Sequence, residues 1–302
     1  MQIKIILSIL TLFSLAFLVP SVVFAATSDG SVDSTVEIND STANGPTLGN
    51  GYWFGRSVEN VGDLDGDGVN DLAVGAILDY GGGSKRGTVN IHFMNSDGSV
   101  KSTVEIDDTT TNGPTLSDND RFGYAIANIG DLDGNGVNDL AVGAAYDDTA
   151  SDGNTHSNGV NSNIGAVHII FLNSDGTLTK QSVVINDSTT NGPDLEDSDY
   201  FGAGVEKIGD LDGNGVNDLA VGAEFDDGAG TDRGALHIIF LNSDGTLTKQ
   251  SVEINDSTID GPTLSDNDRF GSSVADIGDL DGNGVNDLAV GAYLDDGVGS
   301  NR

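Results

Sequence analysis

Residues 122–144 read FGYAIANIGDLDGNGVNDLAVGA, and the 302-residue chain contains this unit four times. The cores from Phe-Gly to Val-Gly-Ala lie at 54–76, 122–144, 201–223 and 270–292. Their acidic loops start 68, 79 and 69 residues apart. The longer spacing comes from an insertion near 149–163, rich in Ser, Asn, Asp and Gly, which predicts an elongated surface loop. Self-similarity at this period predicts a repeat architecture.

Each unit predicts four short strands. In the second copy we expect them at 122–129, 140–144, 167–172 and 183–185. Asn-Ser-Asp-Gly turns join the third strand to the fourth, as in a hairpin. In the first copy, apolar residues of the third strand (89–94) alternate with Asn90 and His92. This period of two predicts a strand with one face more buried than the other.

Four antiparallel strands per repeat predict one blade of a β-propeller. The expected fold is therefore all-β, with β-propeller repeats filling residues 26–302. A β-solenoid has shorter repeats, and separate domains of about 70 residues would each need a core without disulfides. Three blades are complete and one is partial, which favours an incomplete piece of a larger ring over a four-bladed one. Open blade edges would invite self-association.

Residues 1–25 predict a secretory signal. Lys4 is the n-region charge, residues 5–19 are almost wholly apolar, and Val23 and Ala25 occupy positions −3 and −1 of a small-residue cleavage site. An uncleaved membrane anchor is the alternative. Cleavage would leave an extracellular or cell-surface chain with no membrane span, in a compartment where calcium is plentiful.

The composition excludes several classes of protein. There are 48 acidic and 12 basic residues, for a formal charge of −36, and 41 of the acids are aspartate. Nucleic acids and anionic membranes require basic patches, so neither is expected as a partner. The absence of cysteine excludes disulfides and Cys-ligated metals. High acidity also suits a saline environment.

The acidic loops predict calcium sites. Calcium takes six to eight oxygen ligands, and alternate spacing lets the side chains at loop positions 1, 3 and 5 face one concavity. Position 7 offers a backbone carbonyl and position 9 a further carboxylate. The predicted ligands are Asp63, Asp65, Asp67, Val69 and Asp71; Asp131, Asp133, Asn135, Val137 and Asp139; Asp210, Asp212, Asn214, Val216 and Asp218; and Asp279, Asp281, Asn283, Val285 and Asp287.

About four structural calcium ions are therefore expected. The first loop has four carboxylates, so we expect it to bind most tightly. The loops are not EF-hands, since position 12 is valine in each copy where an EF-hand has a bidentate glutamate. Magnesium is less suited, because it prefers water and few carboxylates. A metal-free turn would leave several carboxylates repelling one another.

Phe-Gly, the D-x-D-G-x-G-x-x-D loop and Val-Gly-Ala, four times in order, resemble the FG-GAP repeat of integrin α-subunit propellers and their prokaryotic relatives. The resemblance implies seven blades in a closed ring, structural calcium in the loops at the positions named above, and ring faces that bind protein or matrix partners. It therefore implies adhesion or surface recognition. The chain departs from that pattern in its incomplete ring and in lacking the stalk and membrane-spanning parts.

Other residues give weaker signals. His92, His168 and His237 lie on third strands and are interpreted as strand-surface residues rather than metal ligands. Three Asn-Asp-Ser triplets, at Asn39, Asn186 and Asn255, match N-glycan acceptors, and turn chemistry explains them equally.

Aromatic residues near the Phe-Gly motifs suit core or turn packing better than a ring-face patch; they are Tyr52, Trp53, Tyr124, Tyr146, Tyr200 and Tyr293. No catalytic motif is present, and no pair of acids stands out for glycoside hydrolysis. The chain is therefore predicted not to be an enzyme.

The main hypothesis is a secreted or cell-surface calcium-binding propeller that recognises an extracellular protein, matrix or glycan ligand. Two alternatives stay open. One is the non-catalytic propeller portion of an extracellular hydrolase, and the other is a structural surface-layer or matrix repeat.

Overall fold

A computed structural model describes residues 21–26, 31–148, 163–228 and 230–295. All the regular elements in these ranges are strands, so no described helix could cross a membrane. Most of the predicted signal segment and of the predicted long loop lies outside these ranges. At the end of the signal segment, β1 (Ser21–Ala26) pairs antiparallel with β2 (Val32–Ile38).

Three four-stranded antiparallel sheets follow, each with its strands in chain order. We call them blades one, two and three. Blade one comprises β3 (Phe54–Gly62), β4 (Asp71–Ala76), β5 (Thr88–Met94) and β6 (Val100–Ile106). Blade two comprises β7 (Ile126–Gly130), β8 (Asp139–Ala144), β9 (Ala166–Ile170) and β10 (Val183–Ile185). Blade three comprises β11 (Phe201–Gly209), β12 (Asp218–Ala223), β13 (Ala235–Ile239) and β14 (Val252–Ile254). A two-stranded sheet of β15 (Phe270–Asp276) and β16 (Leu288–Ala292) completes the described chain.

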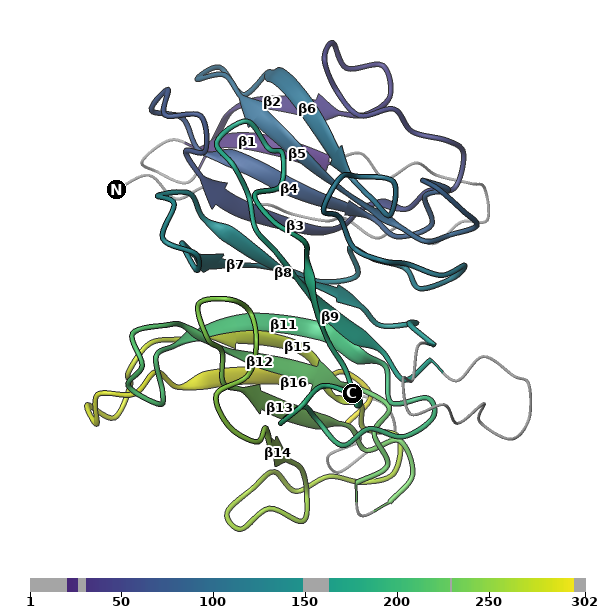
Figure 1. Cartoon of the computed structure of the whole chain (residues 1–302), viewed down its shortest axis with the longest axis vertical. Helices are drawn as coiled ribbons and strands as arrows, with labels where there is room; N and C mark the ends of the chain where they lie inside the picture. The colour runs from purple at the N-terminus through teal and green to yellow at the C-terminus, as the bar shows by residue number, and fades with distance from the viewer. Residues whose placement is uncertain (1–20, 27–30, 149–162, 229, 296–302) are drawn as a thin grey trace.

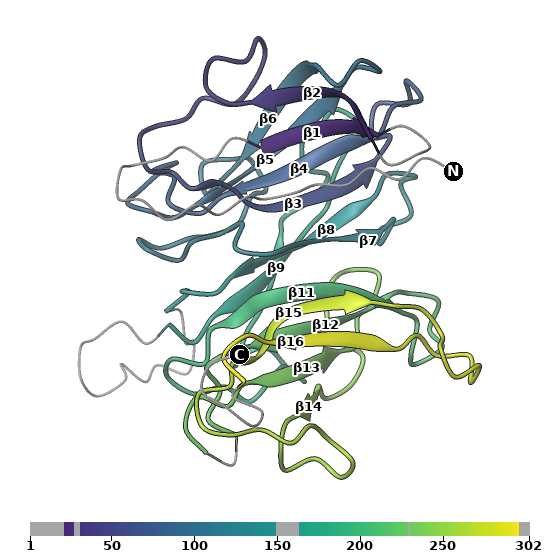
Figure 2. The same ribbon diagram turned by 180° about the vertical axis from the view of Figure 1, so that it is seen from behind.

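This architecture confirms the predicted blades, three complete and one partial. In both views the sheets stack from β1–β2 through the three blades, with β15–β16 against blade three (Figures 1 and 2). The described residues form an open stack and not a closed ring. Each acidic loop joins the first two strands of its sheet, so all the loops lie at the same end of the stack.

The Phe-Gly and Val-Gly-Ala glycines meet across neighbouring blades. A Cβ at Gly143 of β8 would lie 2.1 Å from the carbonyl oxygen of Gly202 in β11. Beside this contact, Gly165 and Phe201 form a parallel bridge, and the Phe201 amide donates to Ile164 O at 2.9 Å. Glycine is therefore required here because the two backbones touch.

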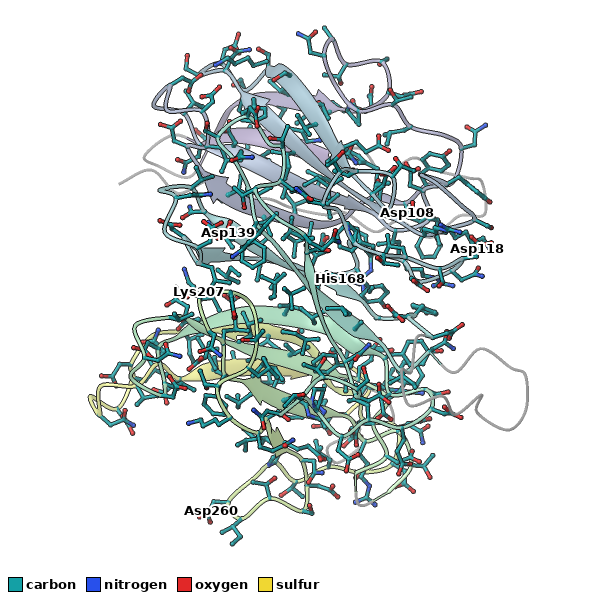
Figure 3. All side chains as sticks on the ribbon, in the orientation of Figure 1. Asp108, Asp118, Asp139, His168, Lys207 and Asp260 are labelled. Carbon is teal, nitrogen blue, oxygen red and sulfur yellow. The ribbon has the colours of Figure 1, made fainter. Side chains whose placement is uncertain are left out.

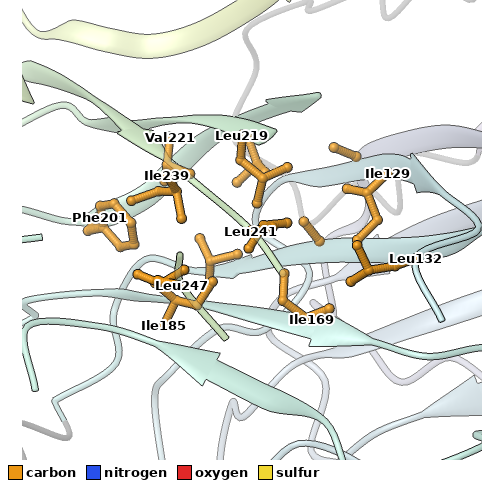
Figure 4. Packing of buried hydrophobic residues seen from close by; sticks show 14 of the residues in the cluster. Ile129, Leu132, Ile169, Ile185, Phe201, Leu219, Val221, Ile239, Leu241 and Leu247 are labelled. Atoms are coloured by element: carbon orange, nitrogen blue, oxygen red, sulfur yellow. The ribbon is translucent and has the colours of Figure 1, made fainter. Parts of the chain in front are cut away.

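The hydrophobic core lies between blades. The largest cluster joins Ile129 and Ile169 of blade two to Phe201, Leu219 and Ile239 of blade three (Figure 4). Neighbouring blades cover both faces of a middle strand, so every described residue of β5, β9 and β13 is buried. The prediction of one more exposed face for the third strand was therefore wrong.

The histidines on the third strands are buried in the same way. His92, His168 and His237 are at most 2% exposed and lie edge-on to the Phe-Gly phenylalanine of their own blade, so the strand-surface interpretation was also wrong. Burial lowers the pKa of His92 to about 4 and keeps its ring neutral.

Candidate metal centres

Three carboxylates converge in each acidic loop. They come from loop positions 1, 3 and 9, and in each loop one oxygen per residue lies within 4.8 Å of the others. The clusters are Asp63, Asp65 and Asp71; Asp131, Asp133 and Asp139; Asp210, Asp212 and Asp218; and Asp279, Asp281 and Asp287. Figure 3 shows Asp139 at one end of the sheets and Asp108 and Asp118 at the other.

Backbone amides orient the first carboxylate of the loop. Asp131 Oδ1 accepts hydrogen bonds from Gly134 N at 2.8 Å and Asn135 N at 2.9 Å, and Oδ2 accepts one from Gly136 N at 2.8 Å. The two glycines have φ of 79° and 87°, in the left-handed region that glycine adopts without steric cost. The loop therefore wraps around its own first carboxylate.

The carboxylate at position 9 connects the loop to the third strand. Asp139 is fully buried; its Oδ2 accepts from Leu132 N at 2.8 Å and its Oδ1 from Leu172 N at 2.9 Å, just beyond β9. Burial raises the pKa of Asp139 to about 6, while these two amides oppose the rise. A positive charge nearby would favour its ionised form.

The position-3 carboxylate of the second loop differs from the others, whose Oδ1 accepts from the position-5 amide. Asp133 Oδ2 accepts from Thr179 Oγ1 at 3.0 Å, whereas the buried Oδ1 has no hydrogen-bond partner among the described residues. In the first loop the ammonium of Lys101 contacts the equivalent Asp65 at 2.6 Å, so this position attracts a cation. Both observations, and the all-oxygen donor set, fit a hard divalent cation.

The side chain at position 5 accepts a hydrogen bond within its own loop. Asp67 lies outside the first cluster: its Oδ1 accepts from Val69 N and its Oδ2 contacts Lys101. In the second loop Asn135 Oδ1 accepts from Val137 N at 2.7 Å, and its Nδ2 donates to Leu172 O at 2.8 Å. The predicted position-5 ligands, Asp67, Asn135, Asn214 and Asn283, each accept from the amide two residues on, and their role as ligands stays a prediction.

The valines at position 7 remain predicted ligands through their backbone carbonyls. Their side chains have a separate role in packing. Val69, Val137 and Val216 are partly buried against the hydrophobic clusters of the blades.

Sequence reasoning missed the asparagine at position 8. Asn138 Nδ2 donates to Val61 O of blade one at 3.0 Å, and Asn217 Nδ2 donates to Ile129 O of blade two at 2.9 Å. A hollow of about 250 Å³ beside this second contact is lined by Asn217 and Asp131, among others. The loops therefore also hold neighbouring blades together. The recurrence of Asn at this position in all four copies was the available signal.

Aromatic and arginine side chains stack across blades at the opposite end. Tyr146 packs edge-on against Tyr200 with ring centroids 4.7 Å apart, and Tyr200 packs against Phe225 at 4.4 Å. Arg121 lies over Tyr146 and Arg269 over Phe225. These contacts fit the packing interpretation. Trp53 and Tyr293, by contrast, are 58% and 56% exposed.

Two of the three glycan-acceptor triplets are poorly placed for modification of the folded chain. Asn186 and Asn255 are buried, and each Oδ1 accepts hydrogen bonds from the serine two residues on. Asn39 makes the same turn and is only partly buried. It is therefore the acceptor that a glycosylating enzyme could reach.

Comparison with known proteins finds integrin α-subunits. Integrin alpha-PS5 of Drosophila melanogaster is 35% identical over 173 residues, which are 57% of this chain and 15% of that protein. Integrin alpha pat-2 of Caenorhabditis briggsae is 30% identical over 237 residues, 77% of this chain and 17% of that protein. Integrin alpha-IIb of Homo sapiens is 33% identical over 175 residues, 57% of this chain and 15% of that protein.

A scan against models of known protein families finds no match. The chain spans 15–17% of the length of these relatives. Together, the repeats, the antiparallel blades and these alignments establish that the chain resembles the FG-GAP β-propeller of integrin α-subunits.

Proposed function

We propose that the chain is a secreted or cell-surface calcium-binding β-propeller that acts as an adhesion or protein-recognition module. Calcium has a structural role in it, at about four loop sites. The observation that carries the proposal is the same three-carboxylate cluster at one end of every described sheet that contains a Phe-Gly motif.

The donor set favours calcium. Three carboxylates and a backbone carbonyl are predicted around each site, and calcium accepts many carboxylates whereas magnesium keeps several waters. A bound calcium ion would supply two positive charges to three carboxylates. Asp133 Oδ1, which lacks a partner among the described residues, is the oxygen best placed to gain from it.

The loop residues explain why such a site would be structural. Asp139 fixes the end of the third strand through Leu172 N, and Asn138 fixes the preceding blade through Val61 O. Carboxylate repulsion would loosen the turn that carries both residues. Relief of that repulsion by calcium would therefore stabilise the blade and its junction with the preceding one.

The recognition role rests on the resemblance to integrin α-subunits. It favours an extracellular protein, matrix or glycan ligand on a face of the propeller, and no enzymatic activity. Self-association belongs to the same proposal, because no described residue covers the outer face of the partial blade. Leu280 there is 72% exposed, whereas the equivalent Leu132 between blades is 5% exposed.

A binding panel tests the proposal. The chain is immobilised and probed with extracellular matrix proteins and glycans in calcium, in EGTA, and in EGTA followed by excess calcium or magnesium. We expect retention of at least one panel member in calcium, loss in EGTA, and recovery with calcium but not with magnesium. Retention that ignores EGTA would contradict the calcium role, and no retention anywhere would contradict recognition.

A further inference from the structure

The first acidic loop differs from the second and third at two positions that lie together in space. Loop position 5 is Asp67 there and asparagine in the other loops. Six residues after the asparagine of the Asn-Ser-Asp-Gly turn, the first copy has Lys101, whereas the second and third copies have Thr179 and Thr248. Where the first copy has an acid and a base, the second and third copies have an amide and a hydroxyl.

These residues meet over the position-3 carboxylate. Lys101 Nζ lies 2.6 Å from Asp65 Oδ2 and 2.8 Å from Asp67 Oδ2. In blade two, Thr179 Oγ1 donates to Asp133 Oδ2 at 3.0 Å. In blade three, Thr248 Oγ1 donates to Asp212 Oδ2 at 2.6 Å. The ammonium therefore occupies the place of a neutral hydroxyl.

The first three acidic loops carry the same formal charge. The first loop carries four carboxylates and one ammonium, a sum of −3, and the second and third loops carry three carboxylates each, also −3. The additional carboxylate, Asp67, lies outside the converging cluster and contacts Lys101. It therefore anchors a cation of the chain and adds no converging oxygen.

We propose that Lys101 is a resident cation of the first loop, so that this loop keeps its turn without a divalent ion and binds one more weakly than the second and third loops do. This inference rests on the proposed calcium function, and it replaces the expectation that four carboxylates make the first loop the tightest. A divalent ion can displace Lys101 only by breaking its two charged contacts, one with Asp65 and one with Asp67.

Ion counting tests the proposal. Tightly bound calcium is counted by native mass spectrometry and its affinity is measured by chelator competition. Asp133→Asn should remove one tight ion, whereas the matched Asp65→Asn should leave the tight count unchanged. Lys101→Thr should raise calcium affinity at the first loop about tenfold or more, by removing the competing charge. Thr179→Lys should weaken the second site.

Lys85→Asn is the control, because it removes the same charge from a loop between β4 and β5, away from the acidic loops, and asparagine suits the φ of 55° at this position. Loss of one tight ion in both aspartate variants, with no change in Lys101→Thr, would overturn the inference and leave the calcium function standing. Absence of calcium from every loop would overturn both.

Discussion

The aspartate at position 9 has two roles in each complete blade. Asp71, Asp139 and Asp218 are at most 1% exposed, and each accepts amide hydrogen bonds from its own loop and from the end of the third strand. Each also belongs to the converging carboxylate cluster. Burying a charged group with paired oxygens and a nearby cation is tolerable, whereas burying it without them is costly.

Asp139→Asn tests this pairing. The amide keeps one acceptor, so one of the amides of Leu132 and Leu172 faces an NH₂ group, and the free energy of unfolding should fall by about 1–3 kcal/mol even without metal. With calcium present the free energy of unfolding should fall further, because the variant lacks one carboxylate ligand for the ion.

Asp260→Asn is the matched control, because Asp260 lies on a loop tip far from the acidic loops (Figure 3) and its φ of 60° suits asparagine. Urea unfolding with and without calcium provides the measurement. Equal stability of the two variants would show that Asp139 has no such role.

The sequence could predict positions 1, 3 and 9 as a cluster because spacing and glycine placement determine them locally. It could not predict the hydrogen bond from Asn135 Nδ2 to Leu172 O, because Leu172 lies far along the chain. The burial of the histidines could not be predicted either, because the residues that cover a third strand belong to the neighbouring blade and are distant in the sequence.

At the scale of elements, glycine pairs set how closely the blades approach. Gly75, Gly143 and Gly222 each contact the Phe-Gly glycine of the next repeat through its carbonyl oxygen. A Cβ at these positions would lie 1.7–2.1 Å from that oxygen, well inside van der Waals contact. The Phe-Gly and Val-Gly-Ala motifs are therefore two halves of one junction between blades.

Gly143→Ala should cost about 3 kcal/mol, because the new methyl group pushes blade two away from blade three. Gly51→Ala is a matched control with φ of 81° and no described atom within 4 Å of the added Cβ. It should cost only about 1–2 kcal/mol of backbone strain. Chemical denaturation of both variants measures the difference, and an equal loss would contradict the close-contact account.

Strand positions were largely predictable, since turn residues and β-branched runs are local signals. The first strand of blade two was expected at 122–129 and instead spans Ile126–Gly130. The amides of Gly123 and Tyr124 both donate to Gly143 O, so regular pairing begins only after this irregularity.

At the scale of the whole molecule, acidity opposes compactness. Burial raises the pKa of Asp120 and Asp199 to about 8, with further contributions from Asp147 and Asp226 respectively. Arginine offsets part of this charge: Arg86 bridges Asp108 and Asp118, and Arg233 bridges Asp256 and Asp266. Those bridges join residues more than 20 apart in sequence, so sequence analysis did not find them.

The acidic loops of blades two and three also contact the preceding blade through Asn138 and Asn217, so metal binding and blade stacking should be coupled. A ligand that binds only the folded state stabilises it by about 2.7 kcal/mol at a hundredfold excess over its Kd. For a chain of this size that corresponds to a rise in Tm of about 4–5 °C for each tight ion.

The most direct test of the account is the melting temperature of the chain by scanning calorimetry in calcium, in magnesium and in EGTA. If calcium occupies three or more loops tightly, the Tm should be more than 10 °C higher in calcium than in EGTA, with little gain from magnesium. The same Tm in calcium and in EGTA would contradict the account.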